Sequence, residues 1–230
     1  MTNDLQQRFQ QVIQHIRDAA ARLGKPEPTL LAVSKKHPSD AIRTLYDLGQ
    51  RDFGESYWQE AESKLADLND LDIVWHFIGP IQSNKTRPIA EHFDWVHSID
   101  REKVARRLSE QRPAHLPPLK VCLQVNIDHE DTKSGVPPEQ VLPLARAVSG
   151  LPNLHLAGLM CIPSRVQAAG EDETPQRAAF HRLALLKQQL EEAGITTQAL
   201  SMGMSDDLEA AIAEGSTLVR VGTALFGERR

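Results

Sequence analysis

The segment Leu119-Lys120-Val121-Cys122-Leu123-Gln124-Val125 is a short, mostly apolar run of the kind that forms a strand in a parallel sheet. Leu218-Val219-Arg220-Val221 has the same character near the C-terminus. Both runs contain polar members, so they are not uniformly hydrophobic core strands. A helical pattern precedes each of them, which indicates an α/β fold.

Strand-like runs and helical patterns alternate along all 230 residues. The first helical stripe runs from Leu5 to Leu23 and stops at Gly24-Lys25-Pro26. Eight expected strands alternating with helices predict a closed parallel (β/α)8 barrel, a TIM barrel, built as a single domain over residues 1–230. The strands are expected near 29–34, 51–54, 73–78, 94–97, 119–126, 154–161, 197–201 and 217–222, and the clearest helices between them at 38–49, 56–68, 101–111, 138–149, 175–193 and 206–214.

An open, doubly wound sheet is the alternative architecture. In a dinucleotide-binding fold of that kind, Gly-x-Gly-x-x-Gly follows the first strand, and this chain has no such sequence there. The most loop-like stretches, 128–135 and 163–175, each follow an expected strand. They are therefore expected on the C-terminal face of the barrel, where enzymes of this fold place their sites.

The bulk composition excludes several classes of partner. A formal net charge of −5 without a basic cluster argues against nucleic acid or an anionic membrane. The sequence lacks a secretory signal and any apolar run near the roughly 18 residues of a membrane span, so a cytoplasmic protein is expected. Cys122 and Cys161 lie in apolar runs, which favours buried reduced thiols. No metal site is expected, because His92, His97 and His115 lack metal-ligand spacing.

Lys35 directly follows the first expected strand, in Leu30-Leu31-Ala32-Val33-Ser34-Lys35. At that position its ammonium could point into the barrel mouth, where apolar surroundings and a nearby cation would lower its pKa and free the amine for Schiff-base chemistry. The alternative is a surface lysine that lies over the rim with its charge in water. Lys36 is equally basic, but strand alternation sends neighbours to opposite faces, so only one of the two can enter the mouth.

The loops after the last two expected strands favour a phosphate site. In barrels of this kind these loops frequently bind phosphate through backbone N–H groups and a helix N-terminus. Gly203 and Ser205 lie in the first loop, and Gly222 and Thr223 in the second. Glycine permits close approach of the backbone, and the hydroxyls add hydrogen-bond donors.

Each of these two segments also has a purely structural explanation. Ser205 fits the N-cap of a helix expected to begin at Asp206, and Gly222 fits a simple turn. Asp206 and Asp207 suit the positive end of that helix but would repel a phosphate. Both carboxylates are therefore expected to point away from the phosphate.

Four further residues are candidates for ligand contact. Arg220 lies inside the last expected strand, two residues before Gly222 and on the same face, so it either lines the interior beside the ligand or forms a structural ion pair. His76 and Asn84 are expected after the third strand, where either could line the mouth, although a lone histidine there is commonly a structural hydrogen-bonding residue. Met160 ends the sixth strand and belongs either to the ligand site or to the core.

Several ordered motifs together resemble the pyridoxal phosphate homeostasis protein family, also called YggS or PROSC. The match runs from about residue 29 to residue 227. The motifs are Ala32-Val33-Ser34-Lys35, Phe53-Gly54-Glu55, Trp75-His76-Phe77-Ile78-Gly79-Pro80-Ile81-Gln82-Ser83-Asn84-Lys85, Lys133-Ser134-Gly135, Gly158-Leu159-Met160, Ser201-Met202-Gly203-Met204-Ser205-Asp206 and Val219-Arg220-Val221-Gly222-Thr223.

The resemblance implies an alanine-racemase-like barrel, of pyridoxal phosphate fold type III, that binds pyridoxal 5′-phosphate (PLP) as an aldimine on Lys35. It places the ring-nitrogen partner at Arg220, which would keep that nitrogen unprotonated and weaken the electron sink. One departure is Ser56, where the family commonly has asparagine. The family's phosphate contacts correspond to Met204, Ser205, Gly222 and Thr223.

The resemblance also implies a carrier or regulator of PLP with no ordinary turnover. Racemases of this fold use a second acid from a separate β-domain, and neither Tyr46 nor Tyr57 looks like a replacement. A racemase-like isomerase is the main alternative, and a Schiff-base aldolase using Lys35 is another. The expected partners are PLP, other B6 vitamers and apo PLP enzymes, and the expected oligomeric state is a monomer.

Overall fold

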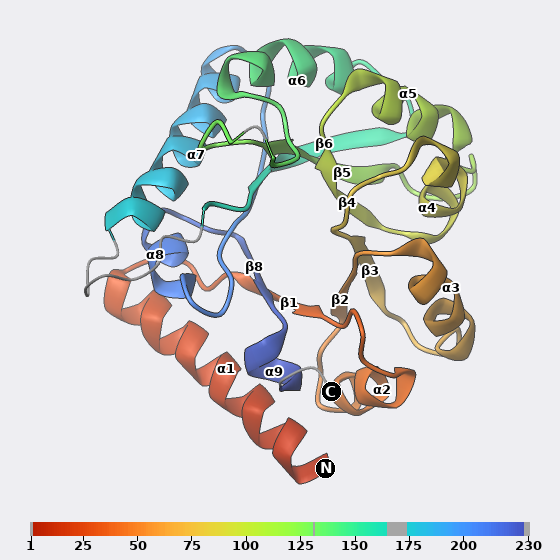
Figure 1. Cartoon of the computed structure of the whole chain (residues 1–230), viewed down its shortest axis with the longest axis vertical. Helices are drawn as coiled ribbons and strands as arrows, with labels where there is room; N and C mark the ends of the chain where they lie inside the picture. The colour runs from red at the N-terminus through yellow and green to blue at the C-terminus, as the bar shows by residue number, and fades with distance from the viewer. Residues whose placement is uncertain (1, 131, 165–173, 228–230) are drawn as a thin grey trace.

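The chain folds as a closed barrel of eight parallel strands. The computed structural model describes residues 2–130, 132–164 and 174–227, and the strand order is β1-β2-β3-β4-β5-β6-β7-β8. β8 pairs with β1 and closes the ring that Figure 1 shows end-on. The strands are β1 Thr29–Val33, β2 Asp52–Glu55, β3 Val74–Phe77, β4 Trp95–Ile99, β5 Leu119–Val125, β6 Leu154–Cys161, β7 Ala199–Ser201 and β8 Leu218–Val221.

Helices surround the barrel on its outside (Figure 1). The α-helices are α1 Thr2–Leu23, α2 Ser39–Asp47, α3 Trp58–Asp67, α4 Thr86–His92, α5 Glu102–Gln111, α6 Val141–Ser149, α7 Thr174–Glu192, α8 Leu208–Ala213 and α9 Thr223–Phe226. Two short 3-10 helices, η1 Ser83–Lys85 and η2 Pro138–Gln140, precede α4 and α6. No helix within the described residues combines the length and apolar composition that crossing a bilayer requires.

The sequence patterns predicted the barrel correctly, and the structure adds two short α-helices and the 3-10 helix η1 to them. Every expected strand and helix is present, with ends displaced by a few residues. α4 and α9 were not expected, because both are short and α4 contains Pro88. Pro88 lies in the first turn of α4, where the N–H that proline lacks has no intrahelical partner to lose. Of the expected loop 163–175, residues 165–173 lie outside the described residues.

The core has two parts. A large apolar layer lies between the strands and the surrounding helices, and a small cluster of Cys122, Ala157, Met160, Ala199 and Leu218 forms a second part. Val219 and Val221 belong to the large layer while Leu218 belongs to the small cluster, as alternation along β8 requires.

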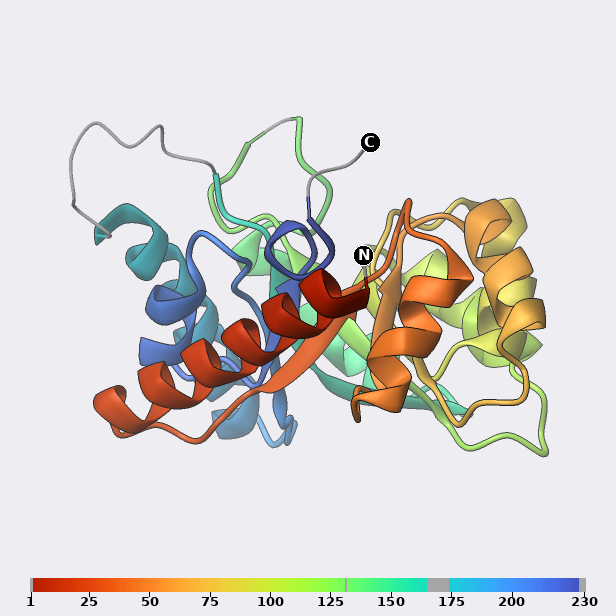
Figure 2. The same cartoon turned by 90° about the horizontal axis from the view of Figure 1, so that it is seen from below.

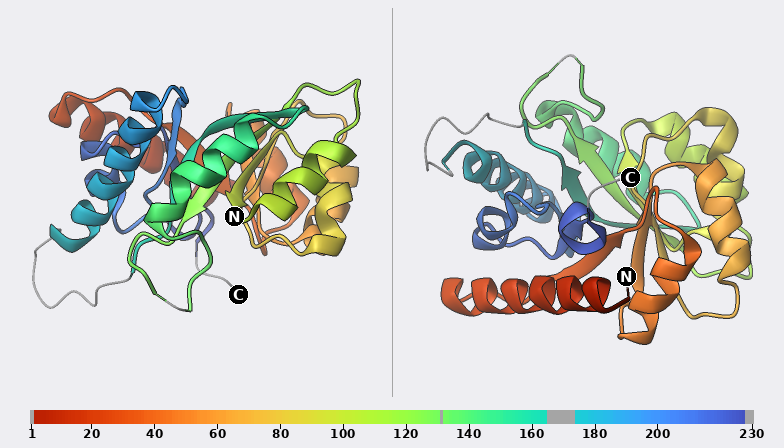
Figure 3. Two further views of the ribbon diagram at one scale, coloured as in Figure 1. Left: turned by 90° about the horizontal axis from the view of Figure 1, so that it is seen from above. Right: turned by 60° about the horizontal axis from the view of Figure 1, so that its bottom comes forward.

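The N-terminal helix closes one side of the molecule. α1 packs against α2, α8 and α9, and Figures 2 and 3 show it running along these helices. Figure 2 also shows α9 and the long segment between β5 and α6 on the same side of the barrel, the side on which the strands end. Residues that follow strands far apart in the sequence therefore gather at one mouth.

Candidate cofactor-binding site

Two adjacent strands bring the predicted amine and the predicted phosphate loop together. β1 pairs with β8, with Ala32 opposite Val221. A Cβ atom built on Gly222, the next residue, would lie 3.5 Å from the carbonyl oxygen of Val33. The turns that begin at Ser34 and at Gly222 are therefore neighbours at the mouth of the barrel.

Lys35 and Lys36 differ in exposure, but strand alternation, the expected reason, does not cause the difference. β1 ends at Val33, so both lysines lie in the following turn, where strand alternation no longer applies. Lys35 is half-buried. Lys36 is exposed and has a φ of 65°, in the left-handed region that a non-glycine residue rarely adopts. The turn itself thus distinguishes the two lysines.

The loop after β7 differs from the expectation in where the next helix begins and in which residue caps it. α8 begins at Leu208 rather than Asp206, and its N-cap is Asp207 rather than Ser205. Asp207 turns back, and its Oδ1 accepts the backbone N–H of Met204 at 2.6 Å. The Asp207 carboxylate thus turns toward its own loop, because the Met204 N–H attracts it, and the orientation of both carboxylates relative to a bound phosphate stays a prediction. Burial raises the pKa of Asp207, and the Met204 N–H opposes that shift.

The two predicted phosphate loops lie beside each other. Gly203 in the first loop accepts the backbone N–H of Arg220 in β8 at 2.9 Å. Gly203 has a φ of 95°, and a Cβ there would lie 2.5 Å from the Cβ of Ala211, so only glycine fits. Met204 and Ser205 are half-buried, and Thr223 is exposed at the start of α9.

Arg220 is almost completely buried inside the barrel. Its Nη1 donates to Ser201 Oγ at 2.8 Å, and its Nη2 donates to the carbonyl oxygen of Cys161 at 2.9 Å. These bonds use two of the five N–H donors of a guanidinium. Burial lowers the pKa of Arg220, although a guanidinium remains cationic in any case.

His76 is an interior residue of β3 and not a residue of the mouth. Its Nε2 lies 2.9 Å from Asp52 Oδ1, its Nδ1 lies 2.9 Å from His97 Nε2, and the ring is fully buried. It also stacks on Trp95, with ring centroids 5.4 Å apart. Burial lowers the pKa of His76. The expectation that it follows the third strand is wrong, because β3 extends to Phe77, and alternation within the strand turns the ring inward.

Asn84, Met160 and Ser56 occupy three different settings. Asn84 is exposed in η1. Met160 is buried in the small core cluster, and it lies opposite Ser201 in the pairing of β6 with β7. Ser56 is buried, and a Cβ on Gly79 would lie 2.0 Å from its carbonyl oxygen, so this backbone contact requires glycine.

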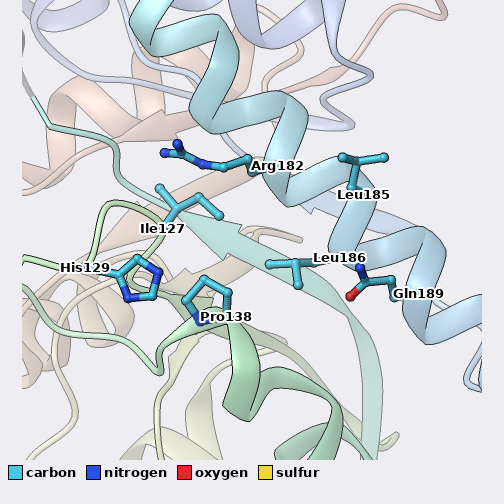
Figure 4. A pocket seen from close by; sticks show the side chains of 7 residues that line it. All are labelled: Ile127, His129, Pro138, Arg182, Leu185, Leu186 and Gln189. Atoms are coloured by element: carbon cyan, nitrogen blue, oxygen red, sulfur yellow. The ribbon is translucent and has the colours of Figure 1, made fainter.

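The structure also contains pockets. One of about 290 Å³ follows β3, β5 and β6 and is lined by Gln124 and Lys133 among others. Lys133 Nζ lies 3.1 Å from Ser164 Oγ and 3.4 Å from Glu130 Oε2. A pocket of about 320 Å³ lies between α7 and the segment after β5 (Figure 4). It is lined by Ile127, His129, Pro138, Arg182, Leu185, Leu186 and Gln189, none of which the sequence predicted as a site residue.

Sequence reasoning missed several buried polar residues around the predicted site. His97 and Ser201 join His76 to Arg220, and Asp52 bonds the other side of His76. Glu55 and Lys64 bond Ser34, the first residue of the turn that contains Lys35. One signal was available in the sequence: His76 and His97 are each the third residue of their strands, so adjacent strands turn both inward.

The barrel belongs to a class defined by alanine racemases. The chain matches the family described as alanine racemase, N-terminal domain, over residues 8–230. A solved structure of PipY from Synechococcus elongatus, with PLP bound, is 38% identical, has a TM-score of 0.78 and covers 92% of this chain and 100% of that chain.

Two curated relatives narrow the family further. The pyridoxal phosphate homeostasis protein of Pseudomonas aeruginosa is 58% identical over 221 residues, which are 95% of this chain and 93% of the relative. The protein of the same name from Escherichia coli K12 is 48% identical over 232 residues, or 99% and 97% of the two chains. The chain belongs to the pyridoxal phosphate homeostasis protein family.

Proposed function

We propose that this chain serves PLP homeostasis: it binds PLP at the mouth of the barrel, holds it through a covalent bond to Lys35, and buffers or delivers it without catalytic turnover. Residues 1–230 act as one PLP-binding domain in this proposal. Family membership and the PLP bound to PipY support it. The expectations of a cytoplasmic location, of a monomer and of binding to other B6 vitamers remain predictions.

One observation carries the proposal, namely the pairing of β1 with β8. It makes neighbours of the turn that contains Lys35 and the turn that contains Gly222 and Thr223. The stacked rings of His37 and Phe226, with centroids 4.6 Å apart, join the same two segments from the side. An amine and a loop rich in N–H and O–H donors thus share one edge of the mouth.

The donor set at the mouth fits the chemical groups of PLP. When bound, PLP supplies an aldehyde carbon, a phosphate and a pyridine nitrogen. Lys35 offers an amine for the first, and the Gly222–Thr223 turn with Ser205 offers donors for the second. Arg220 offers N–H donors beyond the two that already bind Ser201 and Cys161, which suit an unprotonated nitrogen.

The residues divide the task as follows. Lys35 Nζ forms a bond to the aldehyde carbon, the carbonyl oxygen leaves as water, and the same bond is hydrolysed on release. Arg220 donates to the pyridine nitrogen and keeps it unprotonated, because a guanidinium gives up no proton at neutral pH. Met204 contributes its backbone N–H to the phosphate only when Asp207 moves off that group.

A racemase-like isomerase is the alternative function. It needs a second acid opposite the lysine. The Tyr46 hydroxyl accepts the N–H of Asp72, which precedes β3 and so lies at the end of the barrel opposite the mouth. Tyr57 directly precedes α3 on the mouth side and is exposed. Among the described residues no buried tyrosine lies at the mouth, which supports the carrier proposal.

Reduction with borohydride followed by mass spectrometry tests the proposal. Purified protein loaded with PLP should carry one pyridoxyl group on Lys35, and the Lys35→Ala variant should carry none at that site. Lys36→Ala serves as the control and should retain the adduct. A native adduct on Lys36, or no adduct in the wild type, would contradict the assignment. Transfer of PLP to an apo PLP enzyme, followed by the enzyme's recovered activity, tests delivery.

A further inference from the structure

A buried polar network lies against the turn that carries Lys35. Glu55, the last residue of β2, is fully buried, and its Oε1 accepts the Ser34 hydroxyl at 2.6 Å. The ammonium of Lys64, a buried residue of α3, donates to the same oxygen at 2.8 Å. Ser34 is the residue immediately before Lys35, so the network reaches the turn through its first residue.

Lys64 uses all of its hydrogen-bonding capacity in this network. Its Nζ lies 2.8 Å from the carbonyl oxygen of Ser34, 2.8 Å from Glu55 Oε1 and 2.6 Å from Glu60 Oε1. A lysine ammonium has three N–H donors and no acceptor, so three acceptors satisfy it completely. Lys64 therefore offers no lone pair to an aldehyde, although it is bonded to the residue adjacent to Lys35.

The network also holds the residue that follows Lys35. Glu60 Oε1 accepts the backbone N–H of Lys36, whose positive φ is an unfavourable conformation for a lysine. Two side chains of α3 thus bind the backbone on both sides of Lys35, because Lys64 donates to the Ser34 carbonyl oxygen and Glu60 accepts the Lys36 N–H. Such a conformation persists only where surrounding contacts impose it.

One carboxylate oxygen of Glu55 indicates that the network does more than stabilise the fold as an ion pair. Among the described residues, none donates a hydrogen bond to Glu55 Oε2, which is buried. A buried carboxylate oxygen without a donor is unfavourable, and a buried ion pair is often no more stable than an apolar substitute. Burial raises the pKa of Glu55, and the charge of Lys64 opposes that shift. The fold therefore retains a costly arrangement directly beneath the reactive turn.

We infer that Glu55, Glu60 and Lys64 are positioning residues for Lys35, which fix its turn so that its amine meets the aldehyde of the bound cofactor. The inference rests on the proposed function. In this inference Lys35 reacts because contacts on both sides fix its turn. Lys64 does not react, because its three hydrogen bonds to Ser34, Glu55 and Glu60 occupy its ammonium. The step assisted is the attack of Lys35 Nζ on the aldehyde carbon, with loss of water. A displacement near 1 Å can slow such a step about 100-fold.

The test compares covalent capture with simple binding in three variants. Lys64→Met removes the ammonium, Glu60→Ala removes the acceptor of the Lys36 N–H, and Arg112→Met is the control. Arg112 is also a buried cation, and it donates to the carbonyl oxygens of Ala90, Phe93 and Pro117 at the opposite end of the barrel. Capture is followed by the absorbance change on adding PLP and by borohydride trapping. Simple binding is followed with pyridoxine 5′-phosphate, which has no aldehyde.

The expected result is a selective loss. Lys64→Met and Glu60→Ala should slow capture of PLP by about 10- to 100-fold, with pyridoxine 5′-phosphate binding within about twofold of wild type. Arg112→Met should lower the melting temperature with capture unchanged. If Lys64→Met fails to fold, Glu60→Ala decides, because it leaves the Lys64–Glu55 pair in place.

Two outcomes would overturn the inference. One is capture at the wild-type rate in the Lys64 and Glu60 variants, and the other is an equal loss for PLP and pyridoxine 5′-phosphate, which would indicate a damaged site. The absence of any Lys35 adduct in the wild type is a separate result, since it would refute the proposed function whatever the variants do.

Discussion

Arg220 and Asp52 lie at opposite ends of one hydrogen-bonded chain that crosses the inside of the barrel through Ser201, His97 and His76. A guanidinium only donates and a carboxylate only accepts, so the two ends fix the direction of every bond between them. Ser201 accepts from Arg220 and donates to His97, and each neutral histidine carries its proton on Nε2. The chain thereby holds Arg220 at the position proposed for the pyridine nitrogen.

Ser201 is the link on which this chain depends most. Replacing Ser201 with alanine removes the acceptor of a buried cation and the partner of His97 Nδ1, each at 2.8 Å. Leaving a buried group unpaired lowers stability by about 1–3 kcal/mol, and more where a charge is involved. We expect Ser201→Ala to lower the free energy of unfolding by about 2–3 kcal/mol in urea titrations.

Ser98 provides the matched control. Its buried hydroxyl donates to the carbonyl oxygen of Gly79, which is a neutral partner. Ser98→Ala should therefore lower stability by only about 1 kcal/mol. Equal losses in the two variants would indicate that Ser201 serves as an ordinary buried hydroxyl.

The two interior histidines make stability depend on pH. Burial holds the pKa of His97 well below 6.5, with smaller effects from His76 and Arg220, and burial also lowers the pKa of His76 against the opposing effect of Asp52. Below pH 6.5 the unfolded chain therefore binds more protons than the folded chain, so stability falls as the pH falls through that range. The slope should reach about 1.4 kcal/mol per pH unit for each histidine.

The measurement is the free energy of unfolding between pH 5 and pH 8. His97→Gln, which keeps a neutral hydrogen-bonding side chain, should flatten the slope below pH 6.5. His155→Gln, at an exposed residue of β6, is the control and should keep the wild-type slope. A His97→Gln slope identical to that of the wild type would show that other groups govern the acid limb.

The barrel was predictable because its signals are local. Strand and helix periods, glycine and proline stops, and the number of strands all lie in short windows of sequence, and the eight strands were found in this way. α9 could not be found, because four residues are too few to show a helical period. The start of α8 was misplaced because Ser205 and Asp207 are both good N-cap residues, and only the contact between Asp207 and Met204 decides between them.

The candidate site was less predictable because it depends on pairing between distant residues. Lys35 and Gly222 are neighbours because the barrel closes by pairing β1 with β8. The order of strands in the sequence implies this closure but does not give the distance between the two turns. The spacing of His97 excludes a metal site and gives no other sign of a role, yet its ring bonds Ser201, 104 positions further along the chain. Glu60 and Lys64 have the i, i+4 spacing of a surface pair, and only the fold shows that Lys64 is buried.

Thr223 tests the proposed phosphate site. Thr223→Ala removes one hydroxyl donor at the start of α9 and leaves the backbone N–H groups in place. A charge-assisted hydrogen bond is worth about 1.5–3 kcal/mol, so PLP should bind about 10- to 100-fold more weakly, while pyridoxal, which lacks the phosphate, should bind as before. Binding of both is measured by titration of absorbance. Equal losses for the two ligands would indicate that the hydroxyl supports the fold instead.

The last prediction separates a carrier from an isomerase. The chain places an amine, a donor-rich loop and Arg220 at one mouth, and Arg220 would weaken the electron sink by leaving the pyridine nitrogen unprotonated. Racemisation needs a second acid that returns the proton to the opposite face of the α-carbon. We expect amino acids to change the absorbance of the PLP-loaded protein without appreciable exchange of their α-proton. The measurement is deuterium wash-in at the α-carbon of alanine in heavy water.

Tyr57 makes this test specific, because it is exposed on the mouth side just before α3. Wash-in at rates near the usual enzyme range of about 1–10³ s⁻¹ would refute the carrier assignment. If that exchange disappeared in Tyr57→Phe but survived in Tyr46→Phe, Tyr57 would be the missing acid and the chain would be an isomerase. Tyr46 is a suitable control because its ring is covered by Arg51 and its hydroxyl binds Asp72. If the chain is a carrier, the wild type and both variants all lack exchange of the α-proton and deliver PLP equally well.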